Sequence, residues 1–267
     1  AEFDSRNESL DLPRSQQNGR FSYEMLVRKA LLDMQPDLGP DVVGGSWCPH
    51  DGHVNPLYLL RSLHDCLLKK GGSVIVDAKV SAITYQQSLF DVTSTQGRFY
   101  APRLILAAGL GNRTLAPMVG LEQPVRPQKG HILVTQKTDK LIKLPMTQLR
   151  QTAEGSIMIG DSKEEVGFDI SSSADVTAQI ASRAQRTLPA LKNQHIIRSW
   201  AALRVMSPDG NPIYDQSASH PGAYAITCHS GVTLAAAHCF DLASDIEAGC
   251  LGIGLQPFSE RRFHVPA

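Results

Sequence analysis

An unbroken apolar run that ends in two alanines and a glycine, Leu104–Gly109 (LILAAG), constrains the fold more than any other segment. Apolar residues do not alternate with polar ones in this run, which is typical of a strand buried on both faces. Such strands belong to parallel sheets whose two faces are covered by helices. The run therefore predicts that this part of the chain is an α/β structure.

The segments on either side of this strand alternate between two kinds of structure. Blocks at about 51–120 and 197–257 combine strands with helices, and they flank a block of mostly antiparallel strands and one helix. This order predicts a discontinuous nucleotide-binding domain with an inserted substrate domain. The strands are expected in SVIVDAKVSAITYQ, LFDVTST, GRFYA, HILVTQ, MTQLRQT, SIMIG, IIRSWAALRV and GAYAITC, and the helices at about 174–188 and 233–248.

Two more helices are expected near the start of the chain. Apolar residues recur at helical spacing from Phe21 to Met34. A second helix is expected to begin at Pro56, after the N-cap residue Asn55, and to end near Lys70 at a pair of glycines. Its apolar stripe is expected to be buried and consists of Leu59, Leu60, Leu63 and Leu67.

Charge and cysteine content exclude several classes of protein. Lys plus Arg and Asp plus Glu each number 26, so a basic surface for nucleic acid or anionic lipid is not expected. Five irregularly spaced cysteines argue for a reducing compartment, the cytoplasm, rather than a disulfide scaffold. The most apolar region, Gly222–Leu255, is interrupted by histidine and acidic residues, so no transmembrane segment is predicted.

The segment CHSGVTLAAAHCFDLASDI is the most informative for chemistry. A strand is expected to end at Cys228, and a helix to begin near Val232 after a turn of small residues. The free N–H groups at such a helix start bind an anion or a polarised carbonyl. The alternative interpretation is a tight strand-to-helix turn without a ligand.

Two other segments carry weaker signals. Arg204 lies among apolar residues in WAALRV, and a buried guanidinium needs a carboxylate, from the protein or from an amino-acid substrate. Gly109 and Gly111 would permit close approach of a cofactor to the backbone. However, Thr114 occupies the last glycine position of the dinucleotide-binding pattern, and no acidic residue follows at the usual offset.

Metal and hydrolase chemistry have little support in the sequence. Cys48, His50 and His53 lack a second pair of ligands, so a packed cysteine with solvent-facing histidines is expected and no metal site is predicted. The serine in Cys228-His-Ser-Gly-Val232 lacks both flanking glycines of a nucleophile elbow.

Taken in order, these segments resemble the FAD-dependent D-amino-acid oxidase superfamily, over roughly Gly19 to Val265. The ending LQPFSERRFHV and the run HSGVTLA resemble in particular the flavin subunits of the hydrogen cyanide synthase, octopine or nopaline oxidase and hydroxyproline dehydrogenase type. The marks of the resemblance are DGHVNP, LILAAG, PQKGHIL, RQTAEGSIMIG, EEVGFD, WAALRVMSPDGNP and CHSGVTLA.

The resemblance implies an FAD-dependent oxidoreductase acting on the C–N bond of an amino acid or secondary amine, with partner subunits as possible electron acceptors. It implies that Arg204 binds the substrate carboxylate. It also implies noncovalent FAD, because VMSPDG has no cysteine for flavin attachment. The residues that it places against FAD are Val80 at the adenine end, Ala107, Ala108 and Gly109 near the pyrophosphate and ribose, and Gly231, Val232 and Thr233 at the flavin pyrimidine edge.

One departure from the family is large. Complete members begin with a βαβ unit that carries G-x-G-x-x-G, and the first fifty residues contain neither that pattern nor a convincing apolar strand. The chain is therefore expected to be a subunit or a truncated enzyme, or else a non-catalytic fragment that keeps the fold but does not bind FAD alone. The expected parts are 1–50 as a remnant of the first substrate-domain segment, 51–120 and 197–257 as FAD-binding segments, 121–196 as the antiparallel substrate domain, and 258–267 as a tail.

Overall fold

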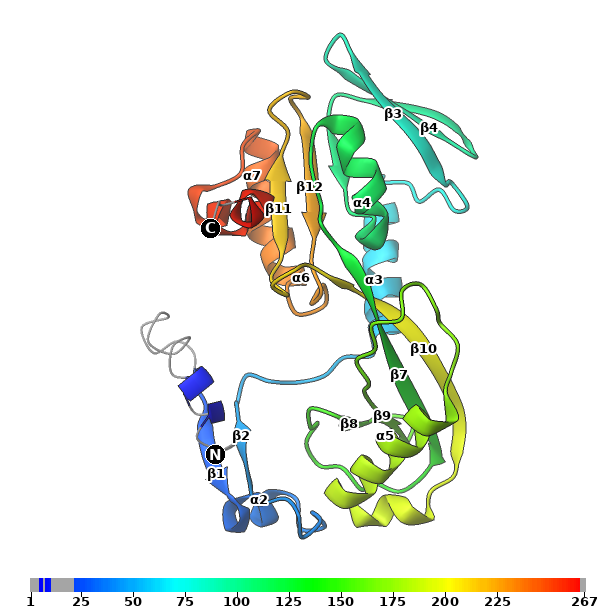
Figure 1. The fold of residues 1–267 in the computed structure, drawn as a ribbon, viewed down its shortest axis with the longest axis vertical. Coiled ribbons are helices and arrows are strands. Elements are labelled where there is room, and N and C mark those ends of the chain that lie inside the picture. The colour runs from blue at the N-terminus through cyan, green and yellow to red at the C-terminus, as the bar shows by residue number, and fades with distance from the viewer. Residues whose placement is uncertain (1–4, 7, 11–21, 265–267) are drawn as a thin grey trace. The chain divides into compact units, whose positions relative to one another are not determined.

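The computed structural model describes residues 5–6, 8–10 and 22–264, which form two compact units (Figure 1). Unit 1 contains residues 1–55, 129–164 and 169–202, and unit 2 contains residues 56–128, 165–168 and 203–267. Two long strands, β7 (Arg126–Lys137) and β10 (Ile196–Met206), each have residues in both units.

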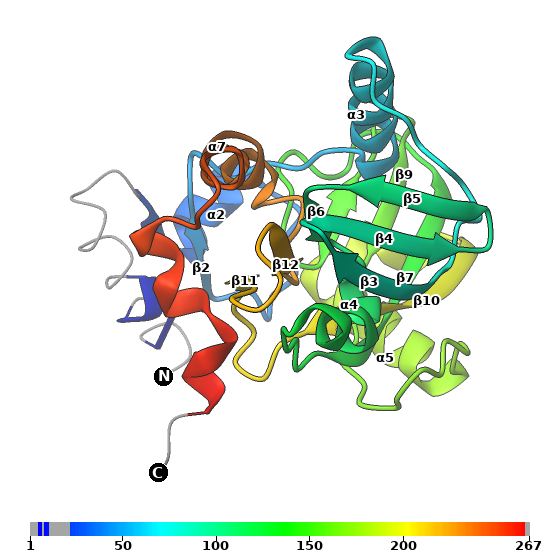
Figure 2. The ribbon, with the colours of Figure 1, turned by 90° about the horizontal axis from the view of Figure 1, so that it is seen from above.

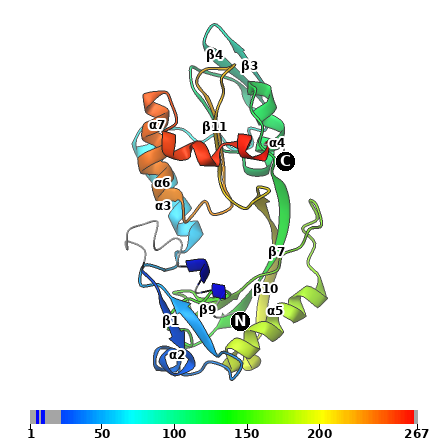
Figure 3. The same ribbon diagram turned by 60° about the vertical axis from the view of Figure 1, so that its left-hand side comes forward.

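Unit 1 is built around a four-stranded sheet with the order β10-β7-β9-β8. The strands β8 (Leu149–Gln151) and β9 (Ser156–Ile159) pair antiparallel, as their alternating apolar residues predict. Helix α5 (Ala174–Thr187) buries Ile180 and Ala184 against this sheet (Figure 3). The 3-10 helix η3 (Pro189–Asn193) follows α5 and adds Leu191 to the same core.

Unit 2 contains two three-stranded sheets. The antiparallel sheet is formed by β3 (Val80–Gln86), β4 (Leu89–Ser94) and β5 (Gly97–Ala101), seen from above in Figure 2. The other sheet has the order β11-β12-β6, in which β12 pairs antiparallel with β11 and parallel with β6. Its strands are β6 (Leu104–Leu106), β11 (Ile213–Gln216) and β12 (Ala223–Thr227).

One apolar core joins the two sheets of unit 2. Phe90 of β4 is fully buried and packs in a cluster with Leu106 of β6 and Ala225 of β12. Ala116 and Val119 from the 3-10 helix η2 (Ala116–Val119) belong to the same cluster. Strands β6 and β12 are therefore supported by side chains from a separate sheet.

Short helices follow strands β6 and β12 of unit 2. After β6 come η1 (Gly109–Gly111) and α4 (Asn112–Leu115), and after β12 comes a helical stretch whose middle turns have π geometry. This stretch consists of α6 (Ala235–Ala237), η4 (His238–Leu242) and α7 (Ala243–Ala248), and the last turns of the described chain are η5 (Ile253–Phe258) and η6 (Glu260–Phe263).

The expected helix from Phe21 to Met34 is only half correct. Phe21 lies outside the described residues, and Glu24–Val27 form strand β1, which pairs antiparallel with β2 (Gly44–Trp47). Helix α2 covers only Arg28–Met34. The pairing with β2 supplies backbone hydrogen bonds that helical periodicity alone does not reveal, so tertiary context decides the structure here.

The expected burial of the leucine stripe on the next helix is wrong. Helix α3 spans Pro56–Lys69, close to the expected bounds, but none of its residues is buried. Leu60, Leu63 and Leu67 are 49%, 46% and 43% exposed. The neighbouring apolar run Val74–Val76, expected to begin a strand, is exposed and lies outside any strand. None of the helices in the described part of the chain is long and apolar enough to cross a membrane.

Candidate functional site

The two glycine-containing bends singled out in the sequence follow neighbouring parallel strands. In the register of β6 and β12, Leu104 lies opposite Ala223 and Leu106 lies opposite Ala225. The carboxyl ends of parallel strands meet at one edge of a sheet, and neighbouring strands are about 4.8 Å apart. The bend at 107–111 and the bend at 228–233 therefore begin side by side, and this edge of unit 2 is the candidate site. In open α/β sheets, ligands bind at the carboxyl ends of the strands.

A buried asparagine, Asn112, links the two bends. Its Nδ2 lies 3.0 Å from the Leu106 carbonyl oxygen, 3.1 Å from the Ile226 carbonyl oxygen and 2.8 Å from Thr227 Oγ1. Its Oδ1 accepts a hydrogen bond from the Ala108 N–H at 3.0 Å. The side chain is fully buried. Asn112 thus fixes the distance between the ends of β6 and β12, although no local pattern in the sequence marks it.

The second bend contains exposed residues whose backbone N–H groups are not used within the described part of the chain. Gly231, Val232 and Thr233 are exposed, and no hydrogen bond within the described residues uses their N–H groups. Leu234 and Ala235 already bond back to the Ser230 and Val232 carbonyls, which begins the helical stretch. These three N–H groups are available to a ligand with negative charge or with a polarised carbonyl oxygen.

The first bend is shaped by glycine and contacts the strand that carries Arg204. Gly109 has φ +57°, a left-handed conformation that glycine adopts without strain. A Cβ atom at Gly109 would lie 3.3 Å from Val205 Cγ2. Val205 is the neighbour of Arg204 on β10, so the half-buried Arg204 lies in the strand segment that adjoins this bend.

The remaining expected site residues occupy different positions relative to this edge. Ala107 and Ala108 are exposed within the first bend. Val80 is the first residue of β3 and packs, half-buried, against the core cluster that contains Leu106. The structure therefore brings Ala107–Gly109 and Gly231–Thr233 together at one edge, while Val80 lies on the neighbouring sheet of the same unit.

Tyr214 of β11 and His238, in the helical stretch that follows β12, form a polar pair. Tyr214 OH lies 2.8 Å from His238 Nε2, and the two rings meet edge to face. Burial of the phenol, together with the nearby Cys228, raises the pKa of Tyr214 to about 12, and burial lowers the pKa of His238. His238 begins the π turn η4, and such turns are frequent at functional sites. Nothing in the sequence pattern marks this pair.

Unit 1 contains a cluster of titratable side chains around the buried Lys129 and His131, which local sequence patterns also fail to reveal. Lys129 is 3% exposed and His131 is fully buried, although both lie in the motif PQKGHIL. Lys129 Nζ lies 2.8 Å from Asp169 Oδ2 and 3.4 Å from Glu164 Oε2, and His131 Nδ1 lies 2.8 Å from Glu164 Oε1. These contacts fasten β7 to the segments around Glu164 and Asp169, so the cluster is a structural clamp.

The lowered pKa values of the clamp carboxylates predict that unit 1 is sensitive to acid. The hydrogen bond from Lys129, followed by those from Ser171, lowers the pKa of Asp169. Burial by itself would raise the pKa of Glu164, but hydrogen bonds from Ser162 and His131 and nearby positive charge outweigh it, so this pKa is also lowered. Groups with lowered pKa stabilise the folded state above their unfolded pKa values, about 4, and lose that contribution as the pH falls further.

We therefore expect the thermal midpoint of unit 1 to fall steeply below about pH 4. Both tryptophans, Trp47 and Trp200, lie in unit 1, so their fluorescence reports its unfolding. Asp169→Asn should flatten this acid dependence. Asp175 is an exposed residue of α5 and has no hydrogen bond or ion pair among the described residues. Asp175→Asn should therefore leave the acid dependence unchanged. If the thermal midpoint of the wild type, Asp169→Asn and Asp175→Asn fell equally with pH, Asp169 would not be the source of the acid dependence.

The cysteine and histidine group near residue 50 has the expected structure. Cys48 is half-buried, and His50 and His53 are exposed. All five cysteines are free thiols.

Comparison with known proteins gives consistent results. A family described as FAD dependent oxidoreductase (DAO) matches residues 1–244. An opine oxidase subunit of Agrobacterium tumefaciens (strain Ach5) is 43% identical over 265 residues, which is 99% of this chain and 71% of the relative. Hydrogen cyanide synthase subunit HcnC of Pseudomonas protegens is 29% identical over 248 residues, which is 89% of this chain and 59% of the relative.

Solved structures show the same fold. Glycine oxidase from Geobacillus kaustophilus superposes with a TM-score of 0.84 at 23% identity, covering 95% of this chain and 71% of that one. L-proline dehydrogenase from P. horikoshii superposes with a TM-score of 0.85 at 20% identity, covering 93% and 71%. The resemblance and the fold class inferred from the sequence are confirmed.

Proposed function

Because this chain belongs to the DAO family of FAD-dependent oxidoreductases, we propose that it is a flavoprotein subunit that oxidises the C–N bond of an amino acid or secondary amine. The observation that carries this proposal is the pair of bends at the shared edge of β6 and β12, linked by Asn112. This edge combines close backbone approach at Gly109 with N–H groups at Gly231–Thr233 that form no hydrogen bond among the described residues.

The residues at this edge fit noncovalent FAD. We propose that the N–H groups of Gly231, Val232 and Thr233 face the flavin pyrimidine edge, that Ala107–Gly109 lie near the pyrophosphate and ribose, and that Val80 lies at the adenine end. When bound, FAD supplies the acceptor for the hydride that leaves the substrate carbon. The exposed N–H groups of the second bend would then stabilise negative charge on the pyrimidine edge, because they are fixed in place before the charge develops.

Arg204 is proposed to orient the substrate. Its planar guanidinium can form two parallel hydrogen bonds with an amino-acid carboxylate. Its position on β10, next to Val205, places it in the strand segment that adjoins the first bend. Holding the carboxylate there would fix the orientation of the carbon–nitrogen bond during hydride transfer.

The rest of the phosphate-binding surface is not supplied by these 267 residues, which contain no G-x-G-x-x-G. We propose that 51–120 and 197–257 are FAD-binding segments and that 121–196 form the substrate domain. On this basis, full affinity for FAD requires a glycine-rich segment from a longer version of the chain or from a partner subunit. The relatives from opine oxidase and hydrogen cyanide synthase are both named as subunits, which supports a heteromeric assembly. The five free thiols support a reducing, cytoplasmic location.

Titration with FAD tests the proposal. A Cβ atom at Gly231 would meet only Cys228 Sγ, at 3.8 Å, so Gly231→Ala should fold normally. The added methyl group would nevertheless obstruct the approach of the flavin edge, and we expect binding at least about tenfold weaker, or about 1.4 kcal/mol. Gly254→Ala is the matched control, because nothing lies within 4 Å of its Cβ position.

Quenching of flavin fluorescence measures the affinity, and circular dichroism confirms that each variant is folded. Equal FAD affinity for Gly231→Ala and Gly254→Ala would remove the second bend from the flavin site. The absence of any FAD binding by the wild-type chain would favour the alternative, in which the chain keeps the fold but binds no FAD alone.

Arg204→Ala is expected to raise KM for an amino-acid substrate at least about tenfold, because charge-assisted bonds to the carboxylate are lost. Glycine and L-proline are suitable probes, with a dye as electron acceptor in the FAD-loaded enzyme. Arg198 lies on the same strand, and its guanidinium packs on Trp200. Arg198→Ala is the control and should leave KM unchanged. An unchanged KM for Arg204→Ala would exclude the carboxylate-binding role.

A further inference from the structure

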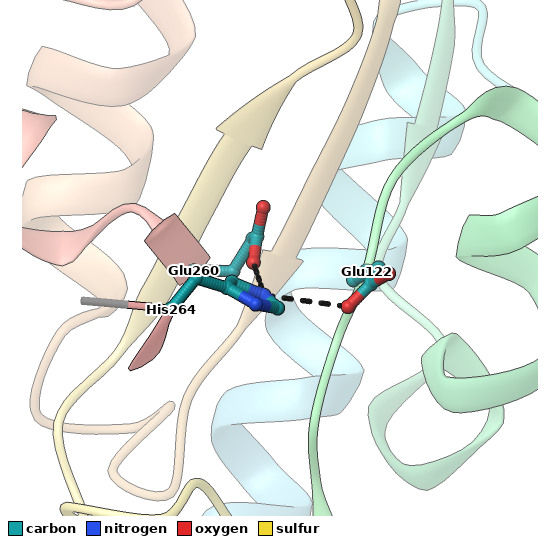
Figure 4. Close-up of side chains that lie close together, drawn as sticks. All are labelled: Glu122, Glu260 and His264. Carbon is teal, nitrogen blue, oxygen red and sulfur yellow. Dashed lines mark ion pairs between the residues drawn. The ribbon is translucent and has the colours of Figure 1, made fainter. Parts of the chain in front are cut away.

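Two carboxylates and an imidazole converge in unit 2, in a cluster that the proposed flavin chemistry does not use (Figure 4). His264 Nε2 lies 3.4 Å from Glu122 Oε2 and 2.6 Å from Glu260 Oε2. The three atoms all lie within 4.8 Å of one another. Glu122 follows η2, whereas Glu260 and His264 are four residues apart along η6 and its C-cap, so the cluster joins two distant parts of the sequence.

Pairing with His264 leaves two carboxylates facing a single imidazole. Glu260 Oε2 is shielded from water and has no hydrogen bond among the described residues, where the contact printed for it is the ion pair with His264 Nε2. Within that part of the chain, neither carboxylate forms an ion pair with lysine or arginine. One imidazole can balance the charge of at most one of the two carboxylates, and an unobserved cation is one explanation for carboxylates that converge in this way.

The backbone around the three side chains is held in place by one buried carboxylate, Asp215. Its Oδ2 accepts hydrogen bonds from Gln123 Nε2 at 3.4 Å and from the Glu260 N–H at 3.0 Å, and its Oδ1 accepts one from Ser259 Oγ at 2.7 Å. Gln123 is 3% exposed, so the residue next to Glu122 is fixed as well. Asp215 therefore sets the spacing between the segment that carries Glu122 and the segment that carries Glu260 and His264.

A second anchor fixes the helical turn that carries His264. The Arg262 guanidinium forms a bidentate pair with Asp209, with distances of 2.8 Å and 3.0 Å. It also donates to the carbonyl oxygens of Phe258, Ser259 and Pro212. Because the backbone on both sides is already ordered, little conformational entropy would be lost when the three side chains bind a common ion.

We propose that Glu122, Glu260 and His264 bind one divalent transition-metal ion of the zinc type, which fastens the segment 259–264 to the segment after η2. Imidazole nitrogen and carboxylate oxygen are ligands that zinc accepts at about 2.0–2.2 Å, so its tetrahedral ligands lie about 3.4 Å apart. The contact between His264 and Glu122 already has this spacing, at 3.4 Å. The distance between His264 Nε2 and Glu260 Oε2, which is 2.6 Å, must increase by less than about 1 Å to reach this spacing. The ion would cancel the charge of the two carboxylates and leave a fourth position for water.

Titration of the metal-free 267-residue chain with Zn²⁺ in a calorimeter tests this site. We expect one site per chain whose affinity falls at least about tenfold in Glu122→Gln and in His264→Ala, because each loses a ligand. Glu247→Gln is the matched control, since Glu247 is an exposed glutamate of α7 in the same unit. Thermal unfolding without metal confirms that the variants are folded, and Zn²⁺ should raise the midpoint of the wild type and of Glu247→Gln only.

Substitution of Co²⁺ for Zn²⁺ identifies the ligands, because free cysteines elsewhere in the chain also bind soft ions. At the proposed site Co²⁺ should give visible bands without a thiolate charge-transfer band, and these bands should disappear in His264→Ala. Three results would overturn the proposal: no binding by the wild type, equal affinity in all variants, or a cobalt spectrum dominated by thiolate. Because FAD is absent from these measurements, failure here leaves the flavin proposal unaffected.

Discussion

Replacing Asn112 with alanine is expected to lower the free energy of unfolding by about 3 kcal/mol, since each buried polar group left without a partner costs about 1–3 kcal/mol. The change removes the acceptor of the Ala108 N–H and the donor to the Leu106 carbonyl and to Thr227 Oγ1. Water cannot replace these bonds readily, because the side chain is fully buried. Urea denaturation followed by far-UV circular dichroism measures the loss.

The same substitution is expected to abolish detectable FAD binding, because the ends of β6 and β12 are no longer held together. Asn112→Asp separates the two functions of the amide. A carboxylate oxygen at this position can still accept a hydrogen bond from the Ala108 N–H, but it cannot donate one to the Leu106 carbonyl. Asn112→Asp should therefore be almost as destabilising as Asn112→Ala. Asn193→Ala, at an exposed position of η3, should change stability by less than about 0.5 kcal/mol. A stable Asn112→Ala that binds FAD normally would show that the two bends do not depend on this residue.

The strands and bends of the candidate site could be predicted because their signals are local. The apolar run at Leu104–Leu106 and the pattern at Ala223–Thr227 both indicate strands, and the small residues after each indicate bends. Helix α3 begins at Pro56 as its capping residues predict. Such features depend on periodicity and turn chemistry within a few residues, which a single sequence reveals.

The parts of the site that could not be predicted depend on contacts between distant segments. No pattern in the sequence distinguishes Asn112 from other polar residues that follow a glycine. Only the parallel pairing of β6 with β12 brings its side chain within hydrogen-bond distance of Thr227. Lys129 has no local mark of burial, and its partners Glu164 and Asp169 lie 35 and 40 residues further along the chain.

The exposed leucines of α3 show how a correct local prediction can lead to a wrong tertiary one. Helical spacing correctly identifies the helix and its apolar stripe. Burial, however, requires a second surface, and spacing within one helix contains no information on whether that surface is present. The same limit applies to Glu24–Val27, where the hydrogen bonds to β2 override a helical pattern.

Phe90→Ala is expected to lower the free energy of unfolding of unit 2 by about 3–5 kcal/mol, the cost typical of removing a large aromatic side chain from a packed core. Phe90 is fully buried, and its ring lies 4.6 Å from that of Tyr85 between ring centroids. It packs in the cluster that supports β6 and β12, so loss of the ring should loosen the edge that carries both bends. Phe99→Ala, on β5 of the same sheet and 37% exposed, should cost much less.

The position of the tryptophans makes this prediction specific to one unit. Trp47 and Trp200 both belong to unit 1, whereas far-UV circular dichroism reports helices and strands of both units. Because two units can unfold in separate transitions, the Phe90→Ala loss should appear in the circular dichroism curve and largely spare the tryptophan fluorescence curve. FAD affinity should fall together with the stability of unit 2. If Phe90→Ala lowered the free energy of unfolding no more than Phe99→Ala, the core between the two sheets would not support the flavin-binding edge.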